Sequence, residues 1–147
     1  MPAYNEAATI EETLKRVISV ELMYGFQKEI VIVNDASKDD TEKVILNFIS
    51  QHPSVEIQYV KHPFNQGKGA ALHTGIAKAG GSHIIIQDAD LEYEPEDIRE
   101  VIGPVLSGET MVCYGSRILK EKALGRAGIC GVLTGKHPDS YFLAYLG

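Results

Sequence analysis

The sequence predicts an α/β fold in which a mainly parallel sheet is flanked by helices. Ile30–Val33 and Ile84–Ile86 are short, largely β-branched apolar runs without polar alternation, which is typical of strands covered on both faces. Segments with helical spacing of apolar residues separate the strands, and such alternation implies right-handed crossovers between parallel strands. The length of 147 residues suits one domain with a hydrophobic core.

The expected elements follow in order after an opening loop at residues 1–6. A helix is expected from Thr9, because Thr9-Ile10-Glu11-Glu12 has the form of a capping box. A second helix carries Val44, Ile45, Phe48 and Ile49 on one face. Further helices are expected over 67–79, from Pro95 onward, and over about 139–146; the strands are expected over 29–35, 55–61, 83–87 and 110–114.

Composition and charge exclude several classes of protein. Apolar residues make up 44% and charged residues 23%, which is typical of a globular chain rather than a disordered one. The net charge of −6 argues against nucleic-acid binding as the main activity. No apolar run reaches the roughly 18 residues of a membrane span. Cys113 and Cys130 are expected to be apolar fillers in a reducing compartment, and the five histidines structural or surface residues.

Four polar clusters follow the predicted strands: residues 34–37, 65–69, 88–90 and 115–117. Ligands of open parallel sheets bind beyond the carboxyl ends of the strands. Because the strands are assigned from hydrophobicity alone, the common position of these clusters is independent evidence for a site there.

Asp88-Ala89-Asp90 is the strongest single signal for chemistry. Two carboxylates at i and i+2 after an extended strand point to one side, and this donor set suits Mg²⁺ or Mn²⁺, which keep positions for water and phosphate oxygens. Residues 88–97 contain six acids and no base, so the cluster would repel a phosphate without a cation. The alternative is a solvated acidic turn with helix-capping acids.

The other two clusters that bear on a ligand are weaker. Gln66-Gly67-Lys68-Gly69 opens a helix, where backbone N–H groups and a lysine suit an anion, although it lacks the Walker A pattern. A solvated lysine at a glycine-rich helix start is the alternative. Asp35 ends a buried strand, where a carboxylate accepts hydrogen bonds from a base or ribose; its alternative is a cap for the following helix.

Five motifs in order and at matching intervals resemble glycosyltransferase family 2, most closely its polyprenyl-phosphate sugar synthase branch. The resemblance covers roughly residues 1–120. The motifs are Pro2-Ala3-Tyr4-Asn5-Glu6, Ile30–Ser37 with Asp39 or Asp40 and Thr41, Asn65–Ala71, Asp88-Ala89-Asp90-Leu91-Glu92, and Gly115-Ser116-Arg117.

This resemblance implies a GT-A fold, a UDP- or GDP-sugar donor, a divalent metal and inversion at the anomeric carbon. It implies that Asp88 and Asp90 hold the metal, with Asp90 and Arg117 as catalytic residues and Arg117 facing donor or acceptor phosphates. The implied nucleotide-binding residues are Pro2, Ala3, Tyr4, Glu6, Asp35 against the base, Lys68, Asp88 and Ala89 beside the ribose. Glu92 stands where relatives often have Gln.

The resemblance also divides the chain. Residues 1–117 are expected to form the donor-binding region, and 118–147 a glycine-rich basic segment leading to an acceptor region beyond the chain. Residues 117–137 hold five basic residues against one acidic residue, which suits an anionic lipid head group or, alternatively, a basic loop without a lipid role. Relatives carry an apolar strand before Pro2, so the chain is expected to be a partial domain. In the longer protein, a polyprenyl-phosphate acceptor and the cytoplasmic face of a membrane are the expected partners.

Three alternatives to a glycosyltransferase remain open at this point. A non-catalytic fragment that binds nucleotide sugars would share every motif above. A phospho-acceptor signalling domain expects its acidic pair after the first strand, whereas here the pair follows a late strand. A sugar nucleotidyltransferase expects a glycine-rich basic loop after its first strand, and Pro2–Glu6 does not supply one.

Overall fold

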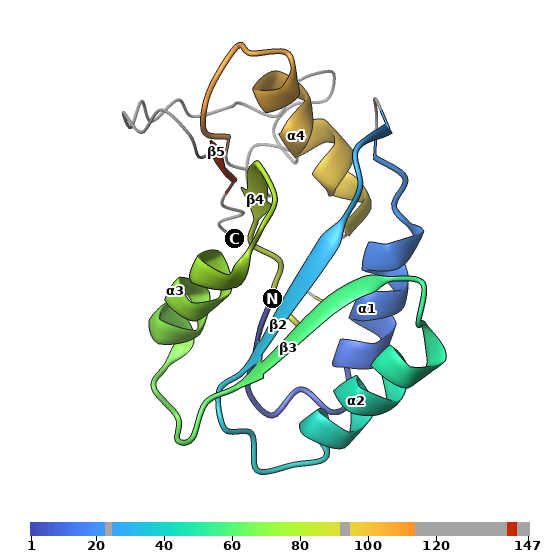
Figure 1. The fold of residues 1–147 in the computed structure, drawn as a ribbon, viewed down its shortest axis with the longest axis vertical. Helices are drawn as coiled ribbons and strands as arrows, with labels where there is room; N and C mark the ends of the chain where they lie inside the picture. The colour runs from blue at the N-terminus through green and yellow to red at the C-terminus, as the bar shows by residue number, and fades with distance from the viewer. Residues whose placement is uncertain (23–24, 92–94, 114–140, 144–147) are drawn as a thin grey trace. The chain divides into compact units, whose positions relative to one another are not determined.

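Strands and helices alternate along the chain in the computed structural model, which describes residues 1–22, 25–91, 95–113 and 141–143 (Figure 1). Two units are distinguished: Met1–Gly80 with Gln87–Glu96, and Gly81–Ile86 with Asp97–Gly147. In chain order the elements are β1 (Pro2–Ala3), α1 (Ile10–Ser19), β2 (Glu29–Asn34), α2 (Thr41–Gln51), β3 (Glu56–Lys61), α3 (Lys68–Lys78), β4 (His83–Ile85), a 3-10 turn (Pro95–Asp97), α4 (Ile98–Leu106) and β5 (Tyr141–Leu143).

The first unit is built on a three-stranded parallel sheet in the order β1-β2-β3. β2 is central. Because all three strands run parallel, the polar residues that follow them lie at the same edge of the sheet. The register pairs Ala3 with Asn34 and Asn34 with Lys61, which aligns the three carboxyl ends. The α/β fold with a mainly parallel sheet is therefore confirmed.

Both faces of β2 are covered, as its unbroken apolar run predicts. α1 and α2 lie on one face of the sheet and α3 on the other (Figure 1). Ile30 and Ile32 join the core beneath α1 and α2, whereas Val33 lies close to Gly75 of α3. The buried core on the α1–α2 side consists of Ala3, Ile10, Leu14, Val17, Ile30, Ile32, Ile45, Phe48 and Ala89. Since side chains alternate along a strand, Asp35 falls on the same face as Val33.

The second unit contains β4, α4 and β5. β4 and β5 pair in parallel, with His83 opposite Tyr141. Val101, Ile102 and Val105 of α4 form a small core with Cys113, against which Ile85 packs. Cys113 is thus a buried apolar filler, as expected, and Cys130 lies outside the described residues.

Three element predictions are wrong. The opening loop contains the short strand β1, whose partner β2 supplies the pairing. Thr110–Cys113 form no strand, because the Thr110 hydroxyl and the Val112 backbone bond each other locally instead of joining a ladder. Within the segment expected to be a helix over about 139–146, Tyr141–Leu143 form β5.

The expected capping box is also absent. Thr9 is the N-cap of α1, but its side chain makes no capping bond to the helix. Its hydroxyl donates instead to a carboxylate oxygen of Glu6 at 2.8 Å. The helix start therefore helps to hold Glu6. Among the described residues, no helix is long and apolar enough to span a bilayer.

Candidate functional site

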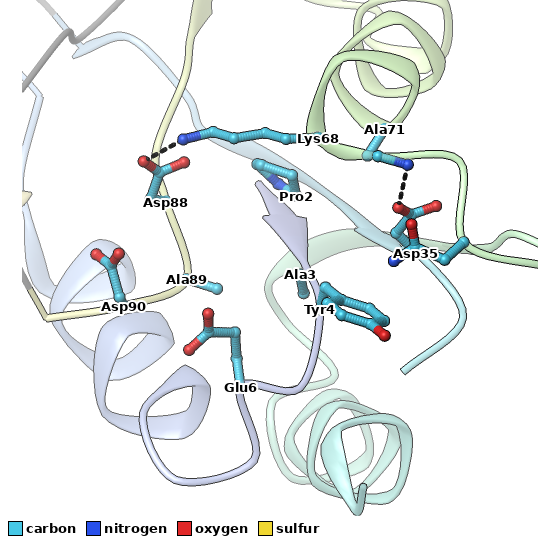
Figure 2. A pocket seen from close by; sticks show the side chains of 12 residues that line it. Pro2, Ala3, Tyr4, Glu6, Asp35, Lys68, Ala71, Asp88, Ala89 and Asp90 are labelled. Atoms are coloured by element: carbon cyan, nitrogen blue, oxygen red, sulfur yellow. Dashed lines mark hydrogen bonds and ion pairs between the residues drawn. The ribbon is translucent and has the colours of Figure 1, made fainter. Parts of the chain in front are cut away.

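The structure brings most of the predicted site residues into one pocket of about 270 Å³ in the first unit (Figure 2). It is lined by Pro2, Ala3, Tyr4, Glu6, Asp35, Asn65, Gly67, Lys68, Ala71, Asp88, Ala89 and Asp90. Every residue expected to bind nucleotide or metal is in this set. Arg117, Glu92 and the basic segment 117–137 lie outside the described residues.

One wall of the pocket is formed by β1 and the loop that follows it. Three side chains hold the loop by accepting hydrogen bonds from its backbone. The N–H of Asn5 donates to Ser37 Oγ (3.0 Å), that of Glu6 to Thr41 Oγ1 (2.8 Å) and that of Ala7 to Asp39 Oδ2 (3.1 Å). These acceptors all follow β2, so the motif after β2 fixes the motif after β1. Hydrogen bonds from Thr41 and Ala7 outweigh the effect of burial and keep the pKa of Asp39 below its usual value.

Asp35 anchors a second wall of the pocket, and the residue is only 3% exposed. The Gln66 N–H donates to Oδ1 at 2.9 Å and the Gly67 N–H to Oδ2 at 2.7 Å, while His62 Nδ1 lies 2.7 Å from Oδ1. Burial would raise the pKa of Asp35, but these hydrogen bonds and the His62 charge lower it below its usual value. Asp35 does not cap α2, so that alternative is wrong; it binds the N–H groups at the start of α3 instead.

Two backbone positions beside Asp35 adopt positive φ. Gly67, the N-cap of α3, has a φ of 87°, which glycine adopts without a steric penalty. Ala36 has a φ of 58°, a conformation that costs an L-residue roughly 1–2 kcal/mol. Such strain persists where surrounding contacts fix it and is frequent at ligand sites.

The Asp88-Ala89-Asp90 turn is fixed by its middle residue and by α1. Ala89 is 3% exposed and packs in the core, which leaves the two flanking carboxylates at the pocket (Figure 2). The buried Thr13 hydroxyl of α1 lies 3.1 Å from the carbonyl oxygens of both Ala89 and Asp90. The turn is thus tied to a helix that begins beside the first motif.

Lys68 extends from the first turn of α3 to Asp88, with 2.7 Å between Nζ and Oδ2. The lysine side chain is 60% exposed and that of Asp88 18% exposed, so the pair is accessible from the pocket. No group of three or more His, Cys, Asp or Glu side chains suited to a metal occurs among the described residues. Asp88 and Asp90 nevertheless fit Mg²⁺ or Mn²⁺, which bind through one or two carboxylates plus phosphate oxygens and water.

Several site residues were not singled out from the sequence. Asn65, Gly67 and Ala71 line the pocket; all three belong to the motif Asn65–Ala71, but none was individually assigned to the site. His62 was expected to be structural or at the surface, and it is a buried partner of Asp35. Its position directly after β3 was the available signal. No sequence signal indicated Thr13, because its contact with the Ala89 carbonyl joins residues that are 76 positions apart.

A parallel α/β layer with a polar pocket beyond its strand ends defines an open-sheet α/β protein with a ligand site at that edge. The family model "Glycosyl transferase family 2" matches residues 1–128, and the chain belongs to that family. Its fold is GT-A, as expected. Membership sets aside the phospho-acceptor and nucleotidyltransferase alternatives.

Similar proteins include a dolichyl-phosphate glucosyltransferase and a polysaccharide synthase. Dolichyl-phosphate beta-glucosyltransferase ALG5A of Trichomonas vaginalis is 33% identical over 132 residues, covering 84% of this chain and 40% of the relative. Poly-beta-1,6-N-acetyl-D-glucosamine synthase of Staphylococcus epidermidis is 37% identical over 90 residues, covering 61% and 20%. The chain therefore spans two fifths or less of the length of these relatives.

A solved structure with a similar fold is that of the mannosyltransferase PcManGT from Pyrobaculum calidifontis in complex with GDP-Man and Mn²⁺. The TM-score is 0.67 and the identity 27%, over 79% of this chain and 34% of that chain.

Replacing Thr13 tests how the Asp88–Asp90 turn is held. Thr13→Val keeps the shape but removes the one hydroxyl donor shared by the Ala89 and Asp90 carbonyls, and we expect it to lower the free energy of unfolding by about 1–3 kcal/mol. Urea denaturation measures this loss, and amide exchange at Ala89–Leu91 localises it. Thr13→Ser is the control because it retains the hydroxyl. A valine variant as stable as the serine variant would contradict this role.

The lowered pKa of Asp35 predicts a pH dependence of stability. Because the folded pKa lies below the unfolded value of about 3.9, the ionised carboxylate stabilises the fold above that pH and the contribution is lost as pH falls through the folded pKa. Asp35→Asn should be less stable near neutral pH and decline less steeply below about pH 4 in urea unfolding. Asp40→Asn, at an exposed residue without a capping bond, should decline as the wild type does. Parallel declines for Asp35→Asn and wild type would refute the assignment.

Proposed function

We propose that this chain is the donor-binding part of a metal-assisted, inverting glycosyltransferase that moves a sugar from a UDP- or GDP-sugar to a polyprenyl phosphate. The observation that carries the proposal is the arrangement of acids in one pocket. Asp35 lies at one side and Asp88 and Asp90 at the other, with β1 between them (Figure 2). That arrangement suits a ligand with a polar base at one end and phosphates at the other.

The nucleotide would lie across β1. The base would meet Asp35 and the exposed Tyr4, whose ring lies beside Asp35 (Figure 2). Pro2, Ala3 and Glu6 would line its path, and the small Ala89 would leave room for the ribose. Lys68, whose ammonium group already reaches Asp88, would turn to the diphosphate oxygens.

Asp88 and Asp90 would hold Mg²⁺ or Mn²⁺ on the diphosphate. A divalent cation bound there neutralises charge that develops on a departing phosphate oxygen. The complex of PcManGT with GDP-Man and Mn²⁺ supports a divalent cation for this chain without distinguishing the two metals. Ala89 and Thr13 would keep the carboxylates in place without rearrangement during the reaction.

Transfer would proceed as a single displacement. The acceptor oxygen attacks the anomeric carbon opposite the diphosphate, a new carbon–oxygen bond forms, and the old bond's electron pair leaves with the nucleoside diphosphate. This geometry inverts the anomeric centre. A phosphate acceptor is already an anionic nucleophile, so a strong general base is less important. Arg117 is proposed to stabilise the charge on the phosphates directly, and Asp90 to do so through the divalent cation that it would hold.

The acceptor and location are proposed from the relatives and from charge. The dolichyl-phosphate name of the Trichomonas relative supports a lipid phosphate. The basic residues within 117–137 suit an anionic head group at the cytoplasmic face of a membrane. The polysaccharide synthase relative favours a second candidate acceptor, a growing glycan.

Nucleotide titration with and without a divalent cation tests the donor site. We expect UDP or GDP to bind in the presence of Mn²⁺ and to bind at least about tenfold more weakly without it, because the acidic turn then repels the diphosphate. Asp88→Asn and Asp90→Asn should each weaken Mn²⁺-dependent binding in calorimetry. Glu56→Gln, at the other end of β3, removes one charge and should bind as the wild type does. Binding that is independent of metal would refute the assignment of Asp88 and Asp90.

Transfer of labelled sugar separates an enzyme from the non-catalytic alternative. In membranes containing the full-length protein, we expect labelled sugar to pass from the nucleotide that binds to added polyprenyl phosphate, and transfer to fall strongly in Asp90→Asn. Glu56→Gln again serves as the matched control. Donor binding without transfer to lipid phosphate or glycan would favour a fragment that only binds nucleotide sugars.

A further inference from the structure

The sheet register places His62 beside Asp35. β2 and β3 pair in parallel up to Asn34 and Lys61, and the next residues on each strand are Asp35 and His62. The His62 N–H continues the ladder by donating to the Asn34 carbonyl at 2.9 Å. Both side chains are buried, at 4% exposed for Asp35 and 7% for His62. This pair therefore follows directly from the strand pairing.

The His62 ring is fixed at both nitrogens. Nδ1 lies 2.7 Å from Asp35 Oδ1, and Nε2 lies 2.9 Å from the hydroxyl oxygen of Thr74 on α3. An ionised carboxylate only accepts hydrogen bonds, so Nδ1 carries a proton and donates it. Thr74 then holds the ring from the other side, and the ring cannot turn away from Asp35 without losing both bonds.

The donors around Asp35 leave it little capacity for a ligand. A carboxylate offers about four acceptor positions, two on each oxygen. Oδ1 accepts from His62 Nδ1 and from the Gln66 N–H, and Oδ2 accepts from the Gly67 N–H. One acceptor position therefore remains, on Oδ2, although Asp35 lines the pocket.

We propose that His62 is a specificity-determining positioning residue: by filling Oδ1, it restricts Asp35 to one N–H donor from the base and so favours uracil over guanine. This rests on the proposed function, in which Asp35 meets the base. Uracil presents a single imide N–H between two carbonyls. The corresponding edge of guanine presents two adjacent N–H donors, which pair with both oxygens of a carboxylate. In this pocket, the second guanine donor loses its acceptor.

Competitive calorimetry with UDP and GDP, each with Mg²⁺, tests the proposal on the full chain. One unpaired donor predicts a preference for UDP of about tenfold. Equal affinity, or tighter binding of GDP, would overturn the role of His62 and leave a nucleotide site in place. If neither nucleotide binds, the proposed function itself fails.

Two variants distinguish the effect of the His62 N–H donor from that of the imidazole ring. His62→Asn keeps an amide N–H near the position of Nδ1, so it should retain the UDP preference. His62→Leu removes the donor and frees Oδ1, so UDP and GDP should bind within about threefold of each other. A leucine variant that keeps the full preference contradicts the proposal. Melting curves establish that each variant is folded.

A measurement on the wild type covers the case in which the leucine variant does not fold. Nitrogen-15 spectra of the histidine rings should show His62 with a protonated Nδ1. An unprotonated Nδ1 would mean that His62 does not fill Oδ1, and the proposal would fall.

Discussion

The pocket depends on one buried carboxylate, that of Asp35. It joins the end of β2, the residue after β3 and the start of α3 through His62, Gln66 and Gly67. Burying a charge is unfavourable unless hydrogen bonds compensate, and here three donors do so. Asp35 also accepts the N–H groups of Gln66 and Gly67, the two residues that lead into α3. The same contacts therefore stabilise the fold and form one wall of the site.

The opposite wall is fixed in a different way. The Asp88–Asp90 turn is anchored through Ala89, which is buried in the core, and through backbone carbonyls that receive the Thr13 hydroxyl. Because Ala89 and the backbone carbonyls anchor the turn, the Asp88 carboxylate can exchange its partner without unfolding it. Lys68 on Asp88 is such an exchangeable partner, because a largely exposed ion pair contributes little stability.

The sequence predicts those features that depend on local pattern, and fails where partners distant in sequence decide. Ile30–Val33 alone predicts a strand covered on both faces, and that assignment places Asp35 at the sheet edge. β1 and β5 are too short for a pattern and exist through pairing with β2 and β4. Thr9 looks like a helix cap, but Glu6 competes for its hydroxyl. The His62–Asp35 bond requires the register of β2 with β3, which periodicity does not specify.

The charge of the pocket constrains what it can bind. Its described lining includes four carboxylates, those of Glu6, Asp35, Asp88 and Asp90, and one cation, Lys68. Glu6 accepts from Thr9, and Asp35 from its three donors, so their charges are partly compensated. A diphosphate that drew Lys68 away would leave Asp88 facing it, and two like charges 4 Å apart repel by about 4 kcal/mol at an effective dielectric of about 20. One lysine cannot neutralise both. The proposed diphosphate ligand would therefore bind more favourably together with a cation than as the bare anion.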